Sequence, residues 1–319
     1  MRHFATAVLA LALLSCGSGG SPDAVAPLPE VAAADTAAPE DIPPPPPTYL
    51  DSLDVCWPDL ACKRAFVISH GGDWDGDDPY DSENAFHRAY DLGADGIKTD
   101  LLVTKDNVAV VAHSSPIEPW ESLDCKGQKI EDMTADAVTA CHLWPSETAT
   151  YQRVDTVLEW ARGKLTIMLT VKDSSAFARA ISTVLEHDAA AFVYIETRMD
   201  NLQGAVVASP DWDKLRYNAE IGSLAELDVL EKAVARPRVL FCEFEPPDAE
   251  TDLAPMTDAI IKRLHPMGMR AFTSSIKMNS VEQHRALYDA GIDVVMSYVL
   301  ANGVKARIDV NTERGVTPP

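Results

Sequence analysis

The sequence lacks the basic excess, the paired-cysteine motif and the glycine-rich turn that mark three common classes of binding protein. Lys and Arg number 27 against 49 Asp and Glu, for a formal charge of −22, so a nucleic-acid backbone is not an expected partner. No C-x-x-C pair occurs, and histidines near cysteines, such as His142 beside Cys141, lack the spacing of zinc ligands. No G-x-G-x-x-G turn follows the first expected strand, which disfavours a dinucleotide-binding sheet.

The apolar N-terminal run, residues 4–14, is too short to span a bilayer. It follows a short basic start and ends in Leu13-Leu14-Ser15-Cys16, which resembles a bacterial lipobox. We therefore expect residues 1–16 to be a lipoprotein signal peptide. Cys16 would carry the lipid that anchors an exported protein to a bacterial membrane, on its periplasmic or cell-surface side. The alternative is an ordinary secretory signal in which Cys16 has no role.

Residues 17–48 are rich in Ala, Pro, Asp, Glu and Ser and include the proline run 43–47. Such a segment cannot bury enough apolar surface to order itself, and the prolines favour a stiff polyproline II spacer. We interpret it as a disordered tether, followed by one domain over residues 49–319. Hydrophobic residues make up 46% of the chain, enough for a substantial core.

Cysteines of exported proteins tend to pair. Cys56 and Cys62 could close a small loop before the first strand, and Cys125 and Cys141 could staple the loop after His113. Connectivity cannot be read from sequence, so both pairings are hypotheses. Cys242 lies in an apolar run and is expected to be a buried free thiol.

Short apolar strands alternate with amphipathic helices along the domain. Strands are expected to start at residues 65, 96, 165, 191, 215, 238, 269 and 292, with a hairpin partner at 108. Helices are expected over residues 82–92, 154–162, 174–187, 201–208, 224–234, 256–264 and 281–290. This alternation indicates a parallel sheet, and eight such units close a TIM-type (β/α)8 barrel; an open doubly wound sheet is the alternative.

Polar residues at the carboxyl ends of barrel strands share one mouth. Here they would be His70, Asp100, His113, Lys172, Glu196, Asn218, Glu243, Thr273 and Ser297. Lys98 and Asp100 lie on one face of their strand, because strand side chains alternate with period two. Two imidazoles flanking an ammonium and a carboxylate suit proton transfer to and from a phosphate ester. The other histidines (87, 142, 187, 265 and 284) are interpreted as surface or packing residues.

A series of short motifs accompanies these residues. They are Ser69-His70-Gly71, Ser82-Glu83-Asn84-Ala85, G-A-D-G-I-K-T-D over 93–100, Thr104-Lys105-Asp106-Asn107, His113-Ser114, Val154-Asp155-Thr156-Val157-Leu158 and Thr170-Val171-Lys172. Together they resemble the motifs of the glycerophosphodiester phosphodiesterase family, over roughly residues 64–310. The resemblance implies a barrel that cleaves phosphodiesters, with His70 and His113 as general acid and base.

The motifs also depart from the family pattern. In the family a divalent ion is held by three carboxylates, of which this chain keeps Asp100; Lys98 and Thr170 occupy the other two positions. Gly71 replaces a phosphate-binding arginine, and Ser114 replaces the acid after the second histidine.

The departures lead to the hypothesis that the Lys98 ammonium takes the place of the ion. Lys172 would assist, and Asp100 and Glu196 would complete the substrate-binding set, since oriented cations stabilise developing phosphate charge. Bacterial phosphatidylinositol phospholipases C look like distant relatives and are similar in replacing the metal with an arginine. No cofactor is therefore assigned. Ca²⁺ or Mg²⁺ is the alternative, with Asp100 and Glu83 as candidate ligands, although one retained carboxylate is a poor site for a hard cation.

The loop after His70 is densely acidic, with aspartates at 73, 75, 77, 78 and 81. It is either a solvated acidic loop or a calcium site, although it fails the EF-hand pattern.

Two functions are compatible with these residues. The first is a lipid-anchored hydrolase of glycerophosphodiesters or phospholipid headgroups. The second is a catalytically inactive barrel lipoprotein that binds a phosphorylated lipid or glycan, with Lys98 and Asp100 forming a salt bridge.

Overall fold

Eight parallel strands form a closed barrel in the computed structural model, which describes residues 56–75, 78–244, 254–274 and 280–316. In ring order they are β1 (Phe66–His70), β2 (Gly96–Val103), β5 (Thr166–Val171), β6 (Val193–Arg198), β7 (Arg216–Ile221), β8 (Val239–Phe244), β9 (Arg270–Ser274) and β10 (Val294–Ser297), and β10 pairs with β1. The predicted (β/α)8 barrel is therefore confirmed. Cys16, the signal segment and the tether fall outside the described residues.

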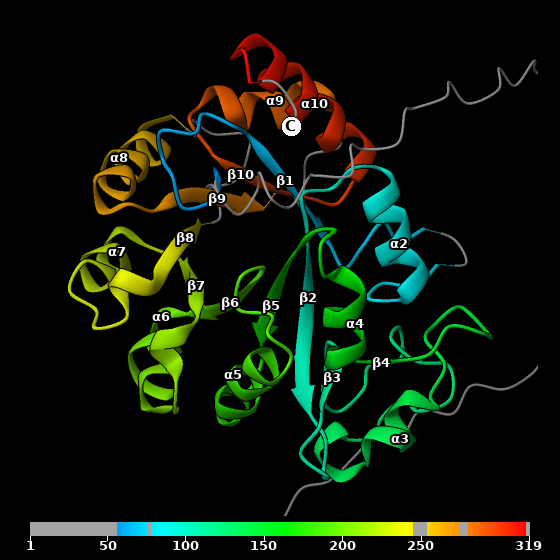
Figure 1. Ribbon diagram of the computed structural model, residues 1–319. Coiled ribbons are helices and arrows are strands. Elements are labelled where there is room, and N and C mark those ends of the chain that lie inside the picture. The colour runs from blue at the N-terminus through cyan, green and yellow to red at the C-terminus, as the bar shows by residue number, and fades with distance from the viewer. Residues whose placement is uncertain (1–55, 76–77, 245–253, 275–279, 317–319) are drawn as a thin grey trace, which may run out of the picture. The chain divides into compact units, whose positions relative to one another are not determined.

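Helices surround the strands (Figure 1). They are α2 (Glu83–Asp91), α4 (Val154–Ala161), α5 (Phe177–Glu186), α6 (Met199–Asn201), α7 (Leu224–Leu230), α8 (Ala254–Leu264), α9 (Val281–Asp289) and α10 (Leu300–Glu313). Short helical turns are η1 (Ile130–Asp132), η2 (Ser174–Ala176), η3 (Leu202–Val206), η4 (Trp212–Lys214), η5 (Arg236–Arg238) and η6 (His265–Met267). Within the described ranges, no helix combines the length and apolarity needed to cross a membrane.

An excursion follows the β2 strand. β3 (Ala109–Val111) forms the predicted antiparallel hairpin with β2, and β4 (Gln152–Arg153) then pairs with β3. The helix α3 (Ala135–Thr139) lies between them in sequence. Neither β4 nor α3 was predicted, because each is too short to show a hydrophobic period.

The final helix, α10, was also not predicted. Asn302 and Gly303 near its start are poor helix formers, so local propensity argues against it. Tertiary packing decides the matter: a Cβ on Gly303 would lie 2.9 Å from the Ser297 Cβ and 3.0 Å from Val67 Cγ2. Glycine at this position therefore lets α10 pack directly against the barrel.

The two faces of each strand belong to different cores. Phe66, Ile68, Met168 and Phe272 are among the residues of a buried cluster inside the barrel, whereas alternate residues such as Val67 pack in the larger cluster with the helices. Since side chains alternate along a strand, His70 continues the inward face of β1. Period-two geometry thus aims the ends of the strands into the mouth.

The opposite end of the barrel is plugged by the segment before β1. Trp57 is fully buried, stacks on Phe66 with ring centroids 3.9 Å apart, and donates from Nε1 to the Thr166 hydroxyl at 3.1 Å. The Arg270 guanidinium donates to the backbone carbonyls of Cys56 and Trp57. This plug leaves the mouth at the carboxyl ends of the strands as the place for function.

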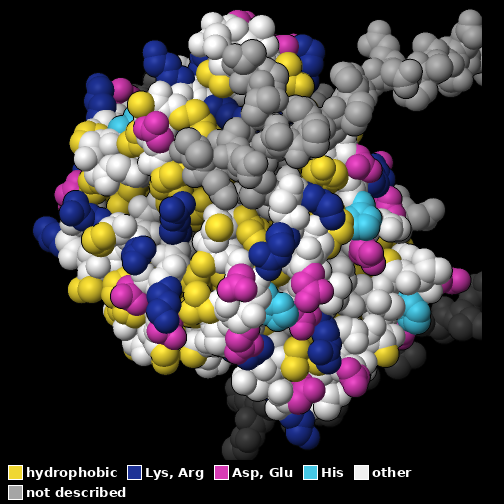
Figure 2. Space-filling model, viewed as in Figure 1, with side chains coloured by type: hydrophobic (Ala, Val, Ile, Leu, Met, Phe, Trp, Pro, Cys, Tyr) yellow, Lys and Arg dark blue, Asp and Glu magenta, His cyan; other side chains and the backbone are white. Residues whose placement is uncertain are grey.

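Both proposed cysteine pairings are confirmed. Cys56 bonds to Cys62 within the plug, and Cys125 bonds to Cys141 in the excursion after His113. Cys242 is a buried free thiol, as predicted. Charged side chains of both signs are interspersed on the face shown in Figure 2.

Candidate active site

Strand register brings five of the predicted residues to the barrel mouth. His70 is the last residue of β1 and pairs in register with Lys98 of β2. Asp100, two residues further along β2, pairs with Thr170 of β5, which in turn pairs with Glu196 of β6. Each lies on the inward face of its strand, so these five side chains, which come from residues 70 to 196, form one layer at the mouth.

Lysines and carboxylates interlock within this layer. Lys98 Nζ lies 3.4 Å from Glu196 Oε1 and 3.8 Å from Asp100 Oδ1. Lys172 Nζ approaches the same Asp100 Oδ1 at 3.2 Å. The Asp100 side chain is fully buried, and its second oxygen accepts a hydrogen bond from the Tyr80 hydroxyl at 3.2 Å. Oδ2 of Asp100 therefore has a hydrogen-bond partner, whereas Oδ1 has ion pairs with the two ammonium groups but no hydrogen bond among the described residues.

Glu196 is satisfied in the same way. Its Oε1 accepts a hydrogen bond from the Thr170 hydroxyl at 2.8 Å, and its Oε2 accepts one from Asn218 Nδ2 at 3.0 Å. Asn218 also donates to Glu243 at 2.9 Å. Burial and the neighbouring Glu196 raise the pKa of Glu243 well above its ordinary value.

Lys98 is the central cation of this layer. Burial opposes its charge, but Glu196, Asp100 and Glu243 outweigh burial and raise its pKa. In return, burial opposes the charge on Glu196, but Lys98 together with the hydrogen bonds from Glu243, Thr170 and Asn218 lowers the Glu196 pKa. Lys98 is therefore a permanent ammonium held between two carboxylates.

A divalent ion does not fit this layer. Ca²⁺ and Mg²⁺ require several free oxygen ligands, whereas Asp100 is shared by two ammonium groups and a phenol, and Glu196 is committed to Lys98, Thr170 and Asn218. An ion at Asp100 would also face the repulsion of two lysine charges.

Glu83 is not brought together with the other candidates. It starts α2, its side chain is 71% exposed, and its nearest charged neighbour is His87 at 4.0 Å. Thr273 and Ser297 of the predicted mouth have structural partners: the Thr273 hydroxyl donates to the Phe244 carbonyl, and Ser297 Oγ lies 2.8 Å from Nε2 of the buried His284.

His70 is half-buried at the end of β1. Its ring stacks on Tyr298, with centroids 4.4 Å apart, and its buried Nδ1 has no hydrogen-bond partner among the described residues. Burial, followed by the charge of Lys98, lowers the pKa of His70 to about 3. His70 is therefore a neutral imidazole at pH 7.

His113 has a carboxylate partner that sequence reasoning missed. His113 Nδ1 lies 3.2 Å from Oε1 of the buried Glu121 and 2.9 Å from the Ser114 hydroxyl. Glu121 is fixed by accepting a hydrogen bond from the backbone N–H of Glu118 at 2.7 Å. On the other side of the ring, His113 Nε2 is 3.9 Å from Asp100 Oδ2. Glu121 lies in an irregular loop, so no local motif could have identified it.

Tyr80 is the second functional residue that the motifs did not reveal. Its ring lies between the two imidazoles, 5.1 Å from His70 and 6.0 Å from His113 by ring centroids. Gly71 has a φ of +68°, and a Cβ added there would lie 2.0 Å from Tyr80 Cε2. The Tyr80 ring thus fills the space that a side chain at position 71 would enter, which explains physically why Gly71 has none.

The described part of the acidic loop does not converge on a cation site. Asp73 and Asp78 both accept hydrogen bonds from the Arg88 guanidinium. Asp81 is buried and accepts one from the Thr99 hydroxyl; burial and Asp100 raise its pKa well above the ordinary value. Asp77 falls outside the described residues.

Elsewhere in the described ranges, one group of metal-ligand type, Asp124 with Cys125 and Cys141, contains the two cysteines of a disulfide. Its sulfurs are bonded to each other and cannot bind a metal as thiolates.

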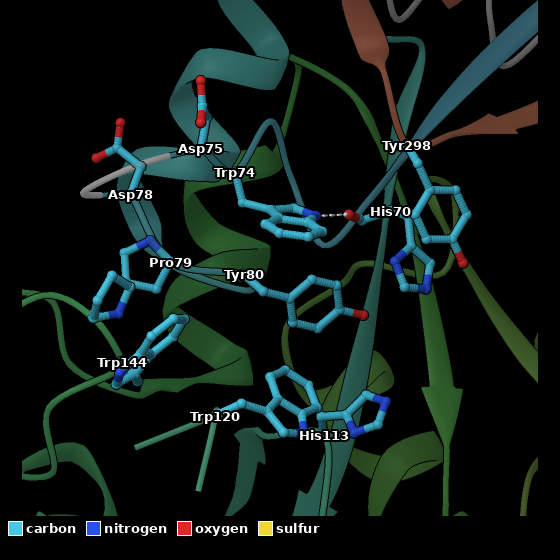
Figure 3. A pocket seen from close by; sticks show the side chains of 11 residues that line it. His70, Trp74, Asp75, Asp78, Pro79, Tyr80, His113, Trp120, Trp144 and Tyr298 are labelled. Atoms are coloured by element: carbon cyan, nitrogen blue, oxygen red, sulfur yellow. Dashed lines mark hydrogen bonds between the residues drawn. The ribbon is translucent and has the colours of Figure 1, made fainter. Parts of the chain in front are cut away.

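Both histidines open onto one pocket of about 430 Å³, called here the aromatic pocket (Figure 3). Its lining residues are His70, Trp74, Asp75, Asp78, Pro79, Tyr80, His113, Trp120, Trp144, Pro145 and Tyr298. A second, polar cleft of about 720 Å³ is also lined by His113, together with Lys172, Ser115, Ser174 and Arg179 among others. His113 therefore stands between two cavities of opposite character.

The sequence pattern of the Glycerophosphoryl diester phosphodiesterase family matches residues 79–296, more than half of the chain. The match includes Lys98, Asp100 and His113 and begins after His70. No match to this chain is found among curated proteins.

Solved structures share the fold at low sequence identity. A glycerophosphoryl diester phosphodiesterase from Parabacteroides distasonis has a TM-score of 0.66 and 17% identity, covering 82% of this chain and 92% of that chain. A glycerophosphodiester phosphodiesterase from Agrobacterium tumefaciens has a TM-score of 0.59 and 18% identity, covering 76% and 99%. An Oleispira antarctica phosphodiesterase in complex with the product sn-glycerol-3-phosphate has a TM-score of 0.56 and 13% identity, covering 77% and 97%.

Proposed function

Since this chain belongs to the glycerophosphoryl diester phosphodiesterase family, we propose that it hydrolyses phosphodiesters of the glycerophosphodiester or phospholipid-headgroup class, with His70 and His113 as its acid–base pair. The observation that carries the proposal is that both imidazoles line one pocket and each also lies near a lysine: His70 pairs in register with Lys98, and His113 and Lys172 line the same polar cleft. The Oleispira relative was solved with sn-glycerol-3-phosphate, which supports a substrate of this class.

The different surroundings of the two histidines suggest their roles. His70, with its pKa lowered to about 3, is neutral at pH 7 and can accept the proton of the attacking oxygen. His113, whose Nδ1 faces the Glu121 carboxylate, would act as the acid that protonates the leaving alcohol. One P–O bond forms and one breaks, and one proton moves from the nucleophile to His70 while another moves from His113 to the product alcohol.

The two lysines would supply the positive charge for the phosphate. Lys172 has a third of its side chain exposed and would contact a phosphate oxygen directly, whereas Lys98 is buried within the layer and would act through its charge. Preorganised cations in a partly dry site stabilise the charge that develops on the phosphoryl oxygens. Hydrolysis without an added metal is a consequence of this arrangement.

Hydrolysis of bis(p-nitrophenyl) phosphate and glycerophosphocholine by the full chain tests the proposal, with EDTA and with added Ca²⁺ or Mg²⁺. We expect turnover that persists in EDTA and falls at least 100-fold in His70→Ala and His113→Ala, because each removes an acid or a base. His87→Ala, an exposed histidine on α2, is the matched control. Activity that appears only with added metal would refute the hypothesis that Lys98 takes the place of a metal ion. It would still support the proposed hydrolysis.

A binding protein without turnover is the second candidate. One observation favours it: the Tyr80 ring occupies the space between the two histidines. This candidate would be supported if neither the unmodified chain nor Tyr80→Ala hydrolyses either substrate, while sn-glycerol-3-phosphate binds measurably. Turnover by the unmodified chain would eliminate it.

We also propose that the protein is an exported lipoprotein anchored through Cys16. The two disulfides support export, because such bonds persist in oxidising compartments. In a bacterial host, Cys16→Ser should move the protein from the membrane fraction to the soluble fraction. Unchanged membrane association would contradict a lipid anchor at this cysteine.

A further inference from the structure

We propose that the aromatic pocket binds a quaternary ammonium group, so that the preferred phosphodiester carries a choline-like alcohol. The turnover part of this inference rests on the proposed hydrolase function, whereas the binding part can be measured without it.

The walls of the pocket are aromatic on several sides. Tyr80 makes edge contacts with Trp74 and Trp120, with ring centroids 5.9 and 6.2 Å apart. Figure 3 shows the Tyr80 ring between those of Trp74 and Trp120, with the Trp144 ring across the pocket from them. Aromatic faces that surround a cavity attract a cation through the ring quadrupole, and quaternary ammonium ligands are recognised in this way.

The three tryptophans of the pocket are not buried in the hydrophobic core. Trp74, Trp120 and Trp144 are 46%, 45% and 51% exposed, so much of each ring faces the pocket or solvent. They come from separate stretches of the chain, yet all three line this one cavity. Large exposed apolar side chains that gather in one place mark a binding surface more often than a packing defect.

The charge of the pocket selects a cation. In the part of the chain that the structure describes, no Lys or Arg lines this pocket, and its acidic members are Asp75 and Asp78. Asp78 is paired with Arg88 at 3.0 Å, whereas Asp75 has no ion pair with any described residue. An acyl chain would gain nothing from these carboxylates, whereas an ammonium matches both the rings and the charge of the pocket wall formed by residues 74–80.

The position of the pocket relative to the histidines fits one half of a diester. A phosphate beside His113 would have the aromatic pocket on one side and the polar cleft on the other. The polar cleft, with Ser174, Ser175 and Arg179, suits the hydroxyl groups of a glycerol. The aromatic pocket would then hold the ammonium alcohol, so each cavity would bind one of the two alcohol groups of the diester.

Binding is tested with choline and with 3,3-dimethyl-1-butanol, its neutral isostere, by calorimetry and tryptophan fluorescence on the full chain. We expect choline to bind at least tenfold more tightly than the isostere. Trp144→Ala and Trp120→Ala should each weaken choline binding about 3- to 30-fold, the range of one cation–π contact, and Trp144→Phe should retain most of the affinity. Val234→Ala, another exposed apolar side chain outside the pocket, is the control.

Three results would overturn the inference. One is equal affinity for choline and its isostere, which indicates a merely apolar pocket. Another is undiminished choline binding in both alanine variants with native unfolding midpoints. The third is equally strong binding to vesicles of phosphatidylglycerol and phosphatidylcholine, which indicates that the tryptophans dock on a lipid surface without reading the headgroup.

Turnover distinguishes this inference from the proposed function. The ratio of kcat/KM for glycerophosphocholine over glycerophosphoglycerol should exceed ten in the unmodified chain and fall several-fold in Trp144→Ala. Turnover of both substrates at equal efficiency would refute the choline preference and uphold the hydrolase. Choline binding without any turnover would uphold the ammonium site and refute the hydrolase.

Discussion

Replacement of Lys98 by Met removes the one ammonium that two buried carboxylates share. Lys98 Nζ lies 3.4 Å from Glu196 and 3.8 Å from Asp100, and its side chain is 9% exposed. At an effective dielectric constant of about 20, these pairs contribute about 5 and about 4 kcal/mol of attraction. Burying the ammonium offsets several kcal/mol of this, so we expect a net loss of about 3–5 kcal/mol, which is typical when one partner of a buried pair is removed.

The pH dependence of this loss follows from the carboxylate. In the unmodified chain the pKa of Glu196 is lowered, so its stabilising effect is complete above the ordinary value of 4.5 and is lost as pH falls through the lower folded value. Without Lys98, burial dominates and raises the pKa of Glu196. The variant should then be least stable near neutral pH and regain stability as Glu196 is protonated, so the difference between the two proteins narrows on acidification.

Urea unfolding of both proteins, with disulfides intact, at pH 7 and at about pH 4.5 measures this difference. Lys305→Met is the matched control, because Lys305 makes an exposed pair with Asp309 on α10, and its midpoint should not change. A Lys98→Met variant as stable as the parent at pH 7, or a deficit that widens on acidification, would refute the assignment of Lys98 as the central buried cation.

Three further predictions concern the chemistry and the packing of the mouth. Glu121→Gln should lower kcat about 100-fold with little change in KM, because His113 loses the carboxylate that faces its Nδ1 and orients the ring. Steady-state kinetics with an unchanged kcat would contradict this role. Gly71→Arg should lower the melting temperature, since Tyr80 occupies the space and φ is +68°, and thermal unfolding checks it; a variant as stable as the parent would contradict the packing. The pKa of His70 is about 3, so His70 remains a neutral base from about pH 8 to about pH 5. Over this range kcat/KM should not fall tenfold per pH unit below about pH 6.5. Such a fall would contradict the role of His70 as the base.

Much of the fold could be predicted because its signals are local. Alternating apolar strands and amphipathic helices predict the barrel, and period two along β2 places Lys98 and Asp100 on one face. The disulfide hypothesis for Cys125 and Cys141 also held, since the two lie close in sequence within one excursion. The helix α10 was missed because its formation depends on close packing at Gly303, which is a long-range property.

The candidate site was predictable only in part. The two histidines and Lys98 stand at strand ends, so their common mouth follows from barrel topology. Glu121 and Tyr80 come from loops, and loop side chains reach a site through tertiary contacts that leave no periodic trace in sequence. Glu83 was a candidate ligand because its motif resembles that of the family. It is the first residue of α2, and its side chain is exposed.

By itself, the sequence determined the barrel and the order of its strands, because these depend on residue identity and short-range pattern. The tertiary structure alone decided that Lys98 is a shared cation and that Glu121 faces His113. It also decided that tryptophans 74, 120 and 144 line one pocket. Those outcomes require side chains from distant parts of the chain to meet within a few ångströms, and only the closed barrel with its packed loops brings them together.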